Sequence, residues 1–240
     1  MMAVALAANS CTRPAAFREG DRILFQGDSI TDGGRQRDGD DLNHTMGQDY
    51  AYLIAARLGA QFPERHLTFL NRGVSGDKIV DLKGRWQRDA ISLKPDMLSI
   101  LVGVNDTGSV VDDWPPVVTV EDYERTYDEL LRQTRAALPG VRLVLCEPFA
   151  LPGGIRTKDR WEERQADLRR RRAAVARLAA KYRAVVVHFQ GMFDDACGRA
   201  PAEYWLWDGI HPTYAGHELI AGEWTREVAR FYSGGEPAPP

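Results

Sequence analysis

Residues 22–34, RILFQGDSITDGG, hold the pattern that decides the fold. A short apolar run, Arg22–Gln26, leads directly into glycine and small polar residues. Such a run is typical of a parallel β-strand that is covered on both faces and turns sharply into a helix. We therefore expect a buried strand at Arg22–Gln26, with polar groups displayed where it ends.

The same alternation of a short apolar run and a longer amphipathic stretch recurs along the chain. Strands are predicted at Arg22–Gln26, Leu67–Asn71, Met97–Val102, Val141–Cys146 and Ala184–Phe189, and helices near 47–60, 77–91, 120–138, 160–182 and 213–231. Helix 120–138 carries an apolar stripe at the helical period, and Thr119 is a suitable N-cap for it. Alternating strands and helices imply right-handed crossovers and a parallel sheet. The prediction is an α/β protein with three layers (α/β/α) and a five-stranded parallel sheet.

Composition excludes several classes of protein. The 240 residues are 44% hydrophobic and 27% charged, as in an ordinary globular domain. The net charge of −3 disfavours a nucleic-acid binder held by phosphate contacts. No run of about 18 apolar residues predicts a membrane span. The cysteines, Cys11, Cys146 and Cys197, are too scattered for a zinc site, so we expect no metal. The sequence has neither a P-loop nor a G-x-G-x-x-G motif, so we expect no cofactor.

The two ends of the chain are expected to lie outside the domain. We predict a flexible segment over residues 1–17, one domain over 18–232 and a disordered tail over 233–240. The small apolar residues at the start leave two interpretations open. Ala5-Leu6-Ala7 has the form of a signal cleavage site, but no basic residues precede it. We expect a cytoplasmic protein, with a secretion-signal remnant as the alternative.

Three candidate functional residues follow predicted strands, at the sheet edge where ligands bind in such folds. Ser29 lies on the turn after the first strand, Gly76 after the second and Asn105 after the third. A glycine lets its backbone N–H approach a ligand oxygen closely, and an asparagine amide can donate to a developing oxyanion. Each has a structural alternative: a helix cap for Ser29, a tight turn for Gly76 and an Asx turn for Asn105.

A fourth segment, Trp205–Pro212, contains Asp208 and His211. Their spacing lets a carboxylate hold one imidazole nitrogen while the other faces a nucleophile. Ser75 is rejected as a nucleophile, because the G-x-S-x-G pattern would require glycine where the chain has Asp77.

These segments, in this order, resemble the four blocks of the SGNH (GDSL-type) hydrolases: GDSI at 27–30, Gly76 in NRGVSGD, GVND at 103–106 and DGIH at 208–211. The resemblance implies a flavodoxin-like fold with Ser29 as nucleophile, His211 as general base and Asp208 as its orienting partner. It also implies an oxyanion hole made of the Ser29 and Gly76 backbone N–H groups and the Asn105 side chain.

Further stretches resemble the acetyl-xylooligosaccharide esterases: GDSITDGGR at 27–35, DLKGRW at 81–86, KPD at 94–96 and WDGIHP at 207–212. This resemblance implies a serine esterase that removes acetyl groups from short xylan fragments and often forms homo-oligomers. We expect Asp28 and Trp207 to contact the substrate. For Trp207 the reason is that aromatic faces stack on sugar rings. Of Trp86, Trp205 and Trp207, at least two are expected to lie in the core.

Two other functions remain open. One is a different SGNH activity, such as a lipase or lysophospholipase, a thioesterase or a platelet-activating-factor-type acetylhydrolase. The other is a non-catalytic carbohydrate-binding protein built on an esterase scaffold. The remaining polar stretch, between Gly34 and His44, is predicted to be a loop, since its aspartates Asp38, Asp40 and Asp41 lack calcium-loop spacing. Cys146 is predicted to be a small core residue.

Overall fold

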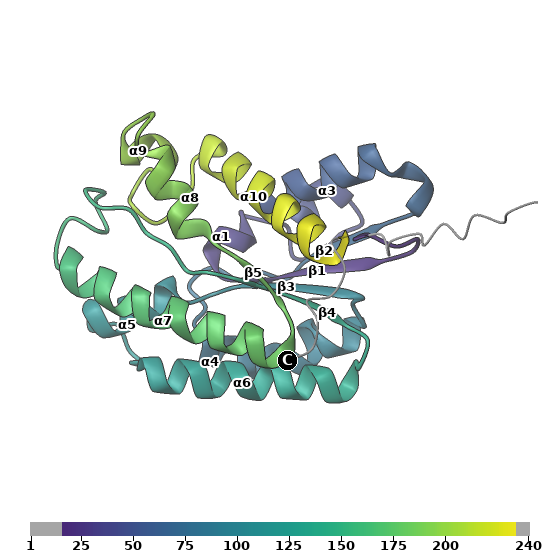
Figure 1. Ribbon diagram of the computed structural model, residues 1–240, viewed down its shortest axis with the longest axis horizontal. Coiled ribbons are helices and arrows are strands. Elements are labelled where there is room, and N and C mark those ends of the chain that lie inside the picture. The colour runs from purple at the N-terminus through teal and green to yellow at the C-terminus, as the bar shows by residue number, and fades with distance from the viewer. Residues whose placement is uncertain (1–15, 234–240) are drawn as a thin grey trace, which may run out of the picture.

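A five-stranded parallel sheet forms the middle layer of the protein, in the order β2-β1-β3-β4-β5 (Figure 1). The structure is a computed structural model, and it describes residues 16–233. The strands are β1 (Arg22–Gly27), β2 (Thr68–Asn71), β3 (Met97–Leu101), β4 (Arg142–Cys146) and β5 (Val185–Val187). All five predicted strands are confirmed, and so is the α/β fold class.

Helices cover both faces of the sheet. One face carries α3 and α10, with α8 nearby, and the other carries α4, α6 and α7 (Figure 1). The helices are α1 (Ser29–Asp32), α2 (Leu42–Met46), α3 (Tyr50–Gln61), α4 (Ile79–Asp89), α5 (Val104–Val111), α6 (Val120–Ala137), α7 (Trp161–Tyr182), α8 (Phe189–Ala196), α9 (Ala202–Trp205) and α10 (Tyr214–Ser233), with 3₁₀ turns at Pro63–Arg65 and Ile91–Leu93. The five predicted helices correspond to α3, α4, α6, α7 and α10.

The prediction of a loop over one polar stretch was wrong, and one structural alternative is excluded. The stretch between Gly34 and His44 is not loop throughout, because α2 begins at Leu42, where the Asp41 side chain accepts hydrogen bonds from the next backbone N–H groups. Asn105 does not lie in an Asx turn but in the first turn of α5. Capping by the Asp41 side chain explains why α2 forms, since it satisfies backbone N–H donors that a helix start leaves unpaired.

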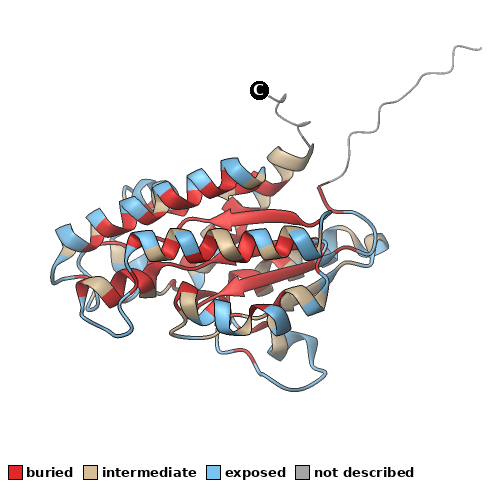
Figure 2. Ribbon diagram, turned by 90° about the horizontal axis from the view of Figure 1, so that it is seen from below, coloured by how far each residue is buried: buried red, intermediate tan, exposed pale blue. Residues whose placement is uncertain are grey.

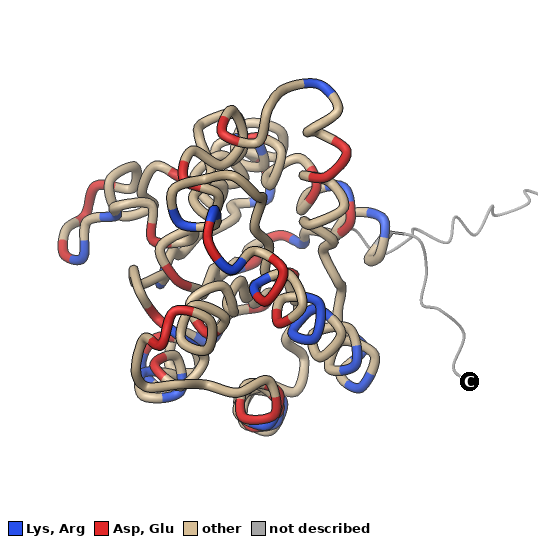
Figure 3. Tube along the Cα trace, turned by 90° about the vertical axis from the view of Figure 1, so that its left-hand side faces the viewer, with Lys and Arg blue, Asp and Glu red and all other residues tan. Residues whose placement is uncertain are grey.

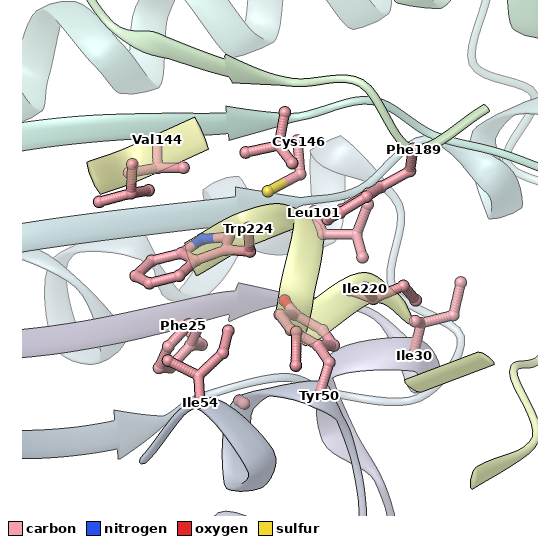
Figure 4. Packing of buried hydrophobic residues seen from close by; sticks show 14 of the residues in the cluster. Phe25, Ile30, Tyr50, Ile54, Leu101, Val144, Cys146, Phe189, Ile220 and Trp224 are labelled. Carbon is pink, nitrogen blue, oxygen red and sulfur yellow. The ribbon is translucent and has the colours of Figure 1, made fainter. Parts of the chain in front are cut away.

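Apolar side chains fill the space on each side of the sheet. On the α3/α10 face, Trp224 packs against Phe25 and donates its indole N–H to Ser99 Oγ at 2.9 Å (Figure 4). On the other face, the apolar stripe of α6, including Tyr127, is fully buried. Thr119 caps α6 by accepting the Asp122 N–H at 3.1 Å, as predicted. Figure 2 shows the resulting pattern, with buried strands and helices that expose only one side.

Cys146 is a buried core residue, as predicted, and burial raises the pKa of its thiol to about 12. Basic and acidic positions are intermixed along the chain in the view of Figure 3. Within residues 16–233, no helix is both long enough and apolar enough to cross a membrane.

The predicted boundary between the flexible N-terminal segment and the domain was placed too late. Ala16 and Phe17 are 6% and 4% exposed, and the Phe17 ring stacks on Trp224 with centroids 6.2 Å apart. Burial of an aromatic ring of this size stabilises the packed position. The rest of the predicted leader, residues 1–15, and the tail from residue 234 lie outside the described residues.

Candidate active site

The carboxyl ends of β1, β2 and β3 bring the first three candidate residues to one edge of the sheet. Ser29 is the first residue of α1, which follows β1 after a single residue, Asp28. Val74 donates its N–H to Gly27 O at 3.0 Å, and this bond holds the loop that contains Gly76 beside the end of β1. Ser29 is partly exposed at this edge.

Ser29, His211 and Asp208 form one hydrogen-bonded chain. Ser29 Oγ lies 2.9 Å from His211 Nε2, and His211 Nδ1 lies 2.7 Å from Asp208 Oδ2. These are the contacts that a Ser-His-Asp relay requires: the imidazole can take the serine proton while the carboxylate holds its other nitrogen. The structure thus brings together three residues that the sequence placed in two distant segments.

Asp208 is fully buried, and it accepts hydrogen bonds on both oxygens. Oδ1 accepts the backbone N–H groups of Ile210 and His211, at 3.0 and 2.7 Å. Burial by itself would raise the pKa of this carboxyl, but the hydrogen bonds from His211 and Ile210 outweigh it and lower the pKa to about 2. Asp208 is therefore an anion at neutral pH, ready to orient and stabilise the imidazole.

Arg156 contacts the candidate site, and the sequence did not reveal it. Its Nε donates to Asp208 Oδ2 at 2.9 Å, on the oxygen that also meets His211. The loop after β4 brings it there, and that loop packs tightly on the segment around Asp208. A Cβ on Gly154 would lie 2.2 Å from the Asp208 carbonyl carbon, so only glycine fits at this position. No motif marks Arg156, because it lies 52 residues before Asp208.

The segment that carries Asp208 and His211 is closed by its own backbone bonds. Trp207 donates its N–H to His211 O at 3.1 Å, and Gly209 donates to Leu206 O at 3.0 Å. The aspartate and the histidine are therefore held in place locally, before any contact with Ser29.

The three predicted oxyanion donors each have an N–H available for a ligand. Gly76 has φ +87°, and within residues 16–233 its N–H donates to no other group. The Ser29 N–H begins a helix and so has no partner inside that helix. Asn105 Nδ2 donates one hydrogen to Asp77 O at 3.0 Å and retains a second.

The backbone conformation supports glycine at position 76, because its positive φ favours that residue. A Cβ there would meet only the Trp114 ring among the described residues, at an ordinary contact distance of 3.8 Å. The close approach of a ligand oxygen to the Gly76 N–H stays a prediction.

Two tryptophans lie beside these groups. Trp207 is 58% exposed, and its ring stacks on the His211 ring with centroids 5.9 Å apart. Trp114, which the sequence analysis did not single out, is 44% exposed next to Gly76. Trp86 and Trp205 are buried, in agreement with the expectation that at least two of the three tryptophans considered are core residues.

Asp28 has a defined structural role. It is 1% exposed, and its Oδ1 accepts the Ile30 N–H at 3.0 Å as the N-cap of α1. Burial raises the pKa of its carboxyl to about 7, against the opposing hydrogen bond from Ile30 and the charge of His211. A contact between Asp28 and substrate stays a prediction.

Ser75 has a different partner from Ser29. Its Oγ and its N–H both donate to Asp32 Oδ2 at 2.9 Å. The Ser75 hydroxyl therefore binds Asp32, whereas His211 binds Ser29. This agrees with the rejection of Ser75 as the nucleophile.

A cleft of about 440 Å³ lies between α2, α3 and the start of α10, lined in part by Gly34, Tyr52 and Tyr214. No member of the Ser29-His211-Asp208 chain lines it. His217, which does, accepts the Tyr50 N–H at 3.2 Å, and burial lowers the pKa of its imidazole to about 4. His217 is therefore a neutral histidine that supports α3.

Comparisons with known proteins identify the family of this chain. The model of the GDSL-like Lipase/Acylhydrolase family matches residues 25–219. The acetylxylan esterase of Geobacillus stearothermophilus is 33% identical over 219 residues, which are 87% of this chain and 94% of that protein.

Solved structures show the same relationship. A protein from Parabacteroides merdae has 36% identity and a TM-score of 0.83, over 88% of this chain and 97% of its own. The acetylxylan esterase Axe2 of Geobacillus stearothermophilus has 28% identity and a TM-score of 0.80, over 93% of this chain and 100% of its own. The chain therefore belongs to the GDSL-like lipase/acylhydrolase family and is a carboxylic ester hydrolase.

Proposed function

We propose that this protein is a serine esterase that removes acetyl groups from short carbohydrate chains such as xylo-oligosaccharides. Ser29 acts as nucleophile, His211 as general base and Asp208 as the residue that orients His211. The observation that carries the proposal is the contact of 2.9 Å between Ser29 Oγ and His211 Nε2, continued by the contact of 2.7 Å to Asp208.

In the acylation step, Ser29 Oγ attacks the ester carbonyl carbon while His211 Nε2 accepts the hydroxyl proton. A serine hydroxyl is a weak nucleophile until a neighbouring base takes this proton. The imidazolium that forms lies against the Asp208 carboxylate, which stays ionised because its pKa is about 2. His211 then gives the proton to the departing alcohol oxygen, and an acetyl-serine remains.

The tetrahedral intermediate carries a negative oxygen, which needs donors that are already in position. The backbone N–H groups of Ser29 and Gly76 and the second Nδ2 hydrogen of Asn105 supply them. Loss of one such donor typically costs about 2.7–4 kcal/mol of transition-state stabilisation. A water activated by His211 then attacks the acetyl-serine and releases acetate.

The carbohydrate part of the proposal rests on two supports. The first is the identity of 33% to a protein named acetylxylan esterase. The second is the pair of exposed tryptophans, Trp114 beside Gly76 and Trp207 beside His211, whose faces suit stacking on sugar rings.

The test compares hydrolysis of p-nitrophenyl acetate, acetylated xylobiose, and octanoyl and palmitoyl esters by the wild type and by Ser29→Ala. We expect acetyl esters to have the highest kcat/KM, and Ser29→Ala to lose about three orders of magnitude or more. Ser75→Ala is the matched control, and we expect it to keep its activity within about tenfold. EDTA in all assays excludes a contribution from an accessible metal ion.

The alternatives give different results. Higher kcat/KM on long-chain or thioester substrates would assign another activity within the family. Binding of xylobiose with no turnover of any ester would assign a carbohydrate-binding protein. Equal activity in the wild type and Ser29→Ala would contradict the assignment of the nucleophile.

A further inference from the structure

A second cavity, of about 600 Å³, is lined mainly by arginines. Its walls are formed by Arg35, Arg37, Asp38, Arg72, Val74, Arg88, Asp89 and Leu93. Four cationic and two anionic side chains face it, so the lining carries a net charge of +2. None of the Ser29-His211-Asp208 chain belongs to it, although Val74 lies only two residues before Gly76.

Two of the four arginines are already matched by carboxylates. Arg37 binds Asp32 Oδ2 at 2.7 Å, and Arg88 binds Asp89 at 2.8 Å. Asp89 also meets Arg85, at 3.4 Å. The remaining acid of the lining, Asp38, is exposed and forms no ion pair within residues 16–233. The positive charge that remains is therefore on the other two arginines.

Arg35 and Arg72 bind only backbone carbonyls among the described residues. Arg35 donates from Nε to Gly73 O at 3.0 Å, and Arg72 donates from NH1 to Asn71 O at 3.0 Å. The two terminal nitrogens of Arg35 make no hydrogen bond to a protein group within residues 16–233 and stay accessible from the cavity. A guanidinium group is planar, and the geometry of its N–H donors matches that of an oxyanion. Two guanidinium groups that line one cavity and have N–H groups without a protein partner can therefore bind one anion together.

We propose that this cavity binds a small dianionic oxyanion of the phosphate type, held between the guanidinium groups of Arg35 and Arg72. A dianion fits better than a monoanion because it can pair with both guanidinium groups, Arg35 and Arg72, neither of which forms an ion pair within residues 16–233. The crowding of cations supports the same conclusion: burial, followed by the charges of Arg37 and Arg72, lowers the pKa of Arg35 to about 10. An anion among these groups relieves that repulsion.

Phosphate can come from two sources, the free ion or a phosphate monoester on a sugar. The experiment is calorimetric titration of the full chain with sodium phosphate, a sugar monophosphate and glucuronate, at constant ionic strength. We expect saturable binding of phosphate with one site per chain and weaker binding of glucuronate. Tighter binding of the sugar phosphate than of phosphate assigns the monoester, and the reverse assigns the free ion.

Variants locate the site. Arg72→Gln is expected to weaken phosphate binding at least tenfold and to fold normally, since the Arg72 side chain makes one hydrogen bond within residues 16–233, to the adjacent carbonyl of Asn71. Arg35→Gln should have the same effect, and a melting curve checks that the loss of the bond to Gly73 leaves the fold intact. Arg169→Gln, which removes an exposed arginine of α7, is the matched control and should bind as the wild type does.

Three results would overturn the proposal. One is a heat no larger than that of sodium chloride at the same ionic strength. The second is equal binding by the wild type and Arg72→Gln. The third is tighter binding of glucuronate than of phosphate. Esterase activity enters none of these measurements, so the outcome is independent of the proposed function.

Discussion

Arg156 and His211 share one oxygen of Asp208. Arg156 Nε and His211 Nδ1 lie 2.9 and 2.7 Å from Asp208 Oδ2. The catalytic carboxylate thus faces two positive groups once the imidazole is protonated, one of them permanently charged. The Arg156 side chain is 60% exposed, so solvent screens much of its charge.

Replacement of Arg156 by glutamine is predicted to affect the pH profile more than the maximal rate. Without this cation, protonation of the imidazole becomes easier, so the acid limb of kcat/KM moves to higher pH. We expect an upward shift of up to about 0.7 pH unit, because exposed ion pairs contribute only about 0–1 kcal/mol and one pH unit corresponds to about 1.4 kcal/mol. Arg156→Lys keeps the charge and should keep the profile. An unchanged profile in Arg156→Gln would show that Arg156 has no influence on the base.

The Asn105 amide is predicted to act in the transition state. Asn105→Ala should lower kcat on p-nitrophenyl acetate by about 10²–10³ with little change in KM, since the lost donor stabilises only the oxyanion. Asn43→Ala, in the exposed helix α2, is the control. Because Asn105 also donates to Asp77 O, a melting curve must accompany the assay. A large rise in KM with unchanged kcat would refute this role.

The buried carboxyl of Asp28 predicts that stability falls as pH rises. Its pKa is about 7 in the folded protein, against an ordinary value of 3.8 for an aspartate side chain. Between these pH values the unfolded chain releases a proton that the folded chain keeps, so rising pH favours unfolding. Asp28→Asn retains an oxygen for the Ile30 N–H and removes the titration.

Melting temperatures measured from pH 4 to pH 7 should therefore fall less steeply in Asp28→Asn than in the wild type. Some slope remains, because burial also raises the pKa of Asp49, to about 8, and that of Asp106, to about 6. Parallel curves for the two proteins would exclude a raised pKa at Asp28.

The exposed tryptophans predict a difference between substrates. Trp114→Ala is expected to raise KM for acetylated xylobiose about 2- to 12-fold, the equivalent of about 0.5–1.5 kcal/mol for one aromatic contact. Its kcat/KM on p-nitrophenyl acetate, which has no sugar ring, should change less than about twofold. Trp207→Ala tests the other side of the site, where loss of stacking on His211 adds an effect on both substrates. Equal losses on both substrates in Trp114→Ala would exclude sugar stacking.

The sequence predicts the long elements well, because a long element repeats its pattern. All five strands were located to within two residues at each end, and β5 is shortened the most, since Val185–Val187 is the extent of its pairing with β4. Helices such as α1 and α9 span four residues, too few to show a helical period. The helix α5 was missed for another reason: the polar residues Asn105 and Asp106 at its start indicated a turn.

The residues of the candidate site also fall into two groups, those that the sequence predicted and those that it did not. Ser29, Asp208 and His211 lie in recognisable segments, and their contacts follow from the order of the strands. Arg156 and Trp114 lie in loops after β4 and α5, and no spacing rule connects them with the residues they meet. Their positions depend on how loops pack in three dimensions, which a single sequence does not encode as a pattern.

Ser29 and His211 are 182 residues apart in the chain, although their side chains touch. Asp208 and His211 are only three apart and are held by bonds within their own segment. During folding, the acid–base pair can therefore assemble early, whereas the nucleophile joins it only after the first strand and the last helix have docked on the same sheet. Recovery of esterase activity after dilution from denaturant should consequently lag behind recovery of helix content. The rate at which esterase activity returns then measures the last long-range step of folding. Spectroscopic probes of local structure do not detect that step.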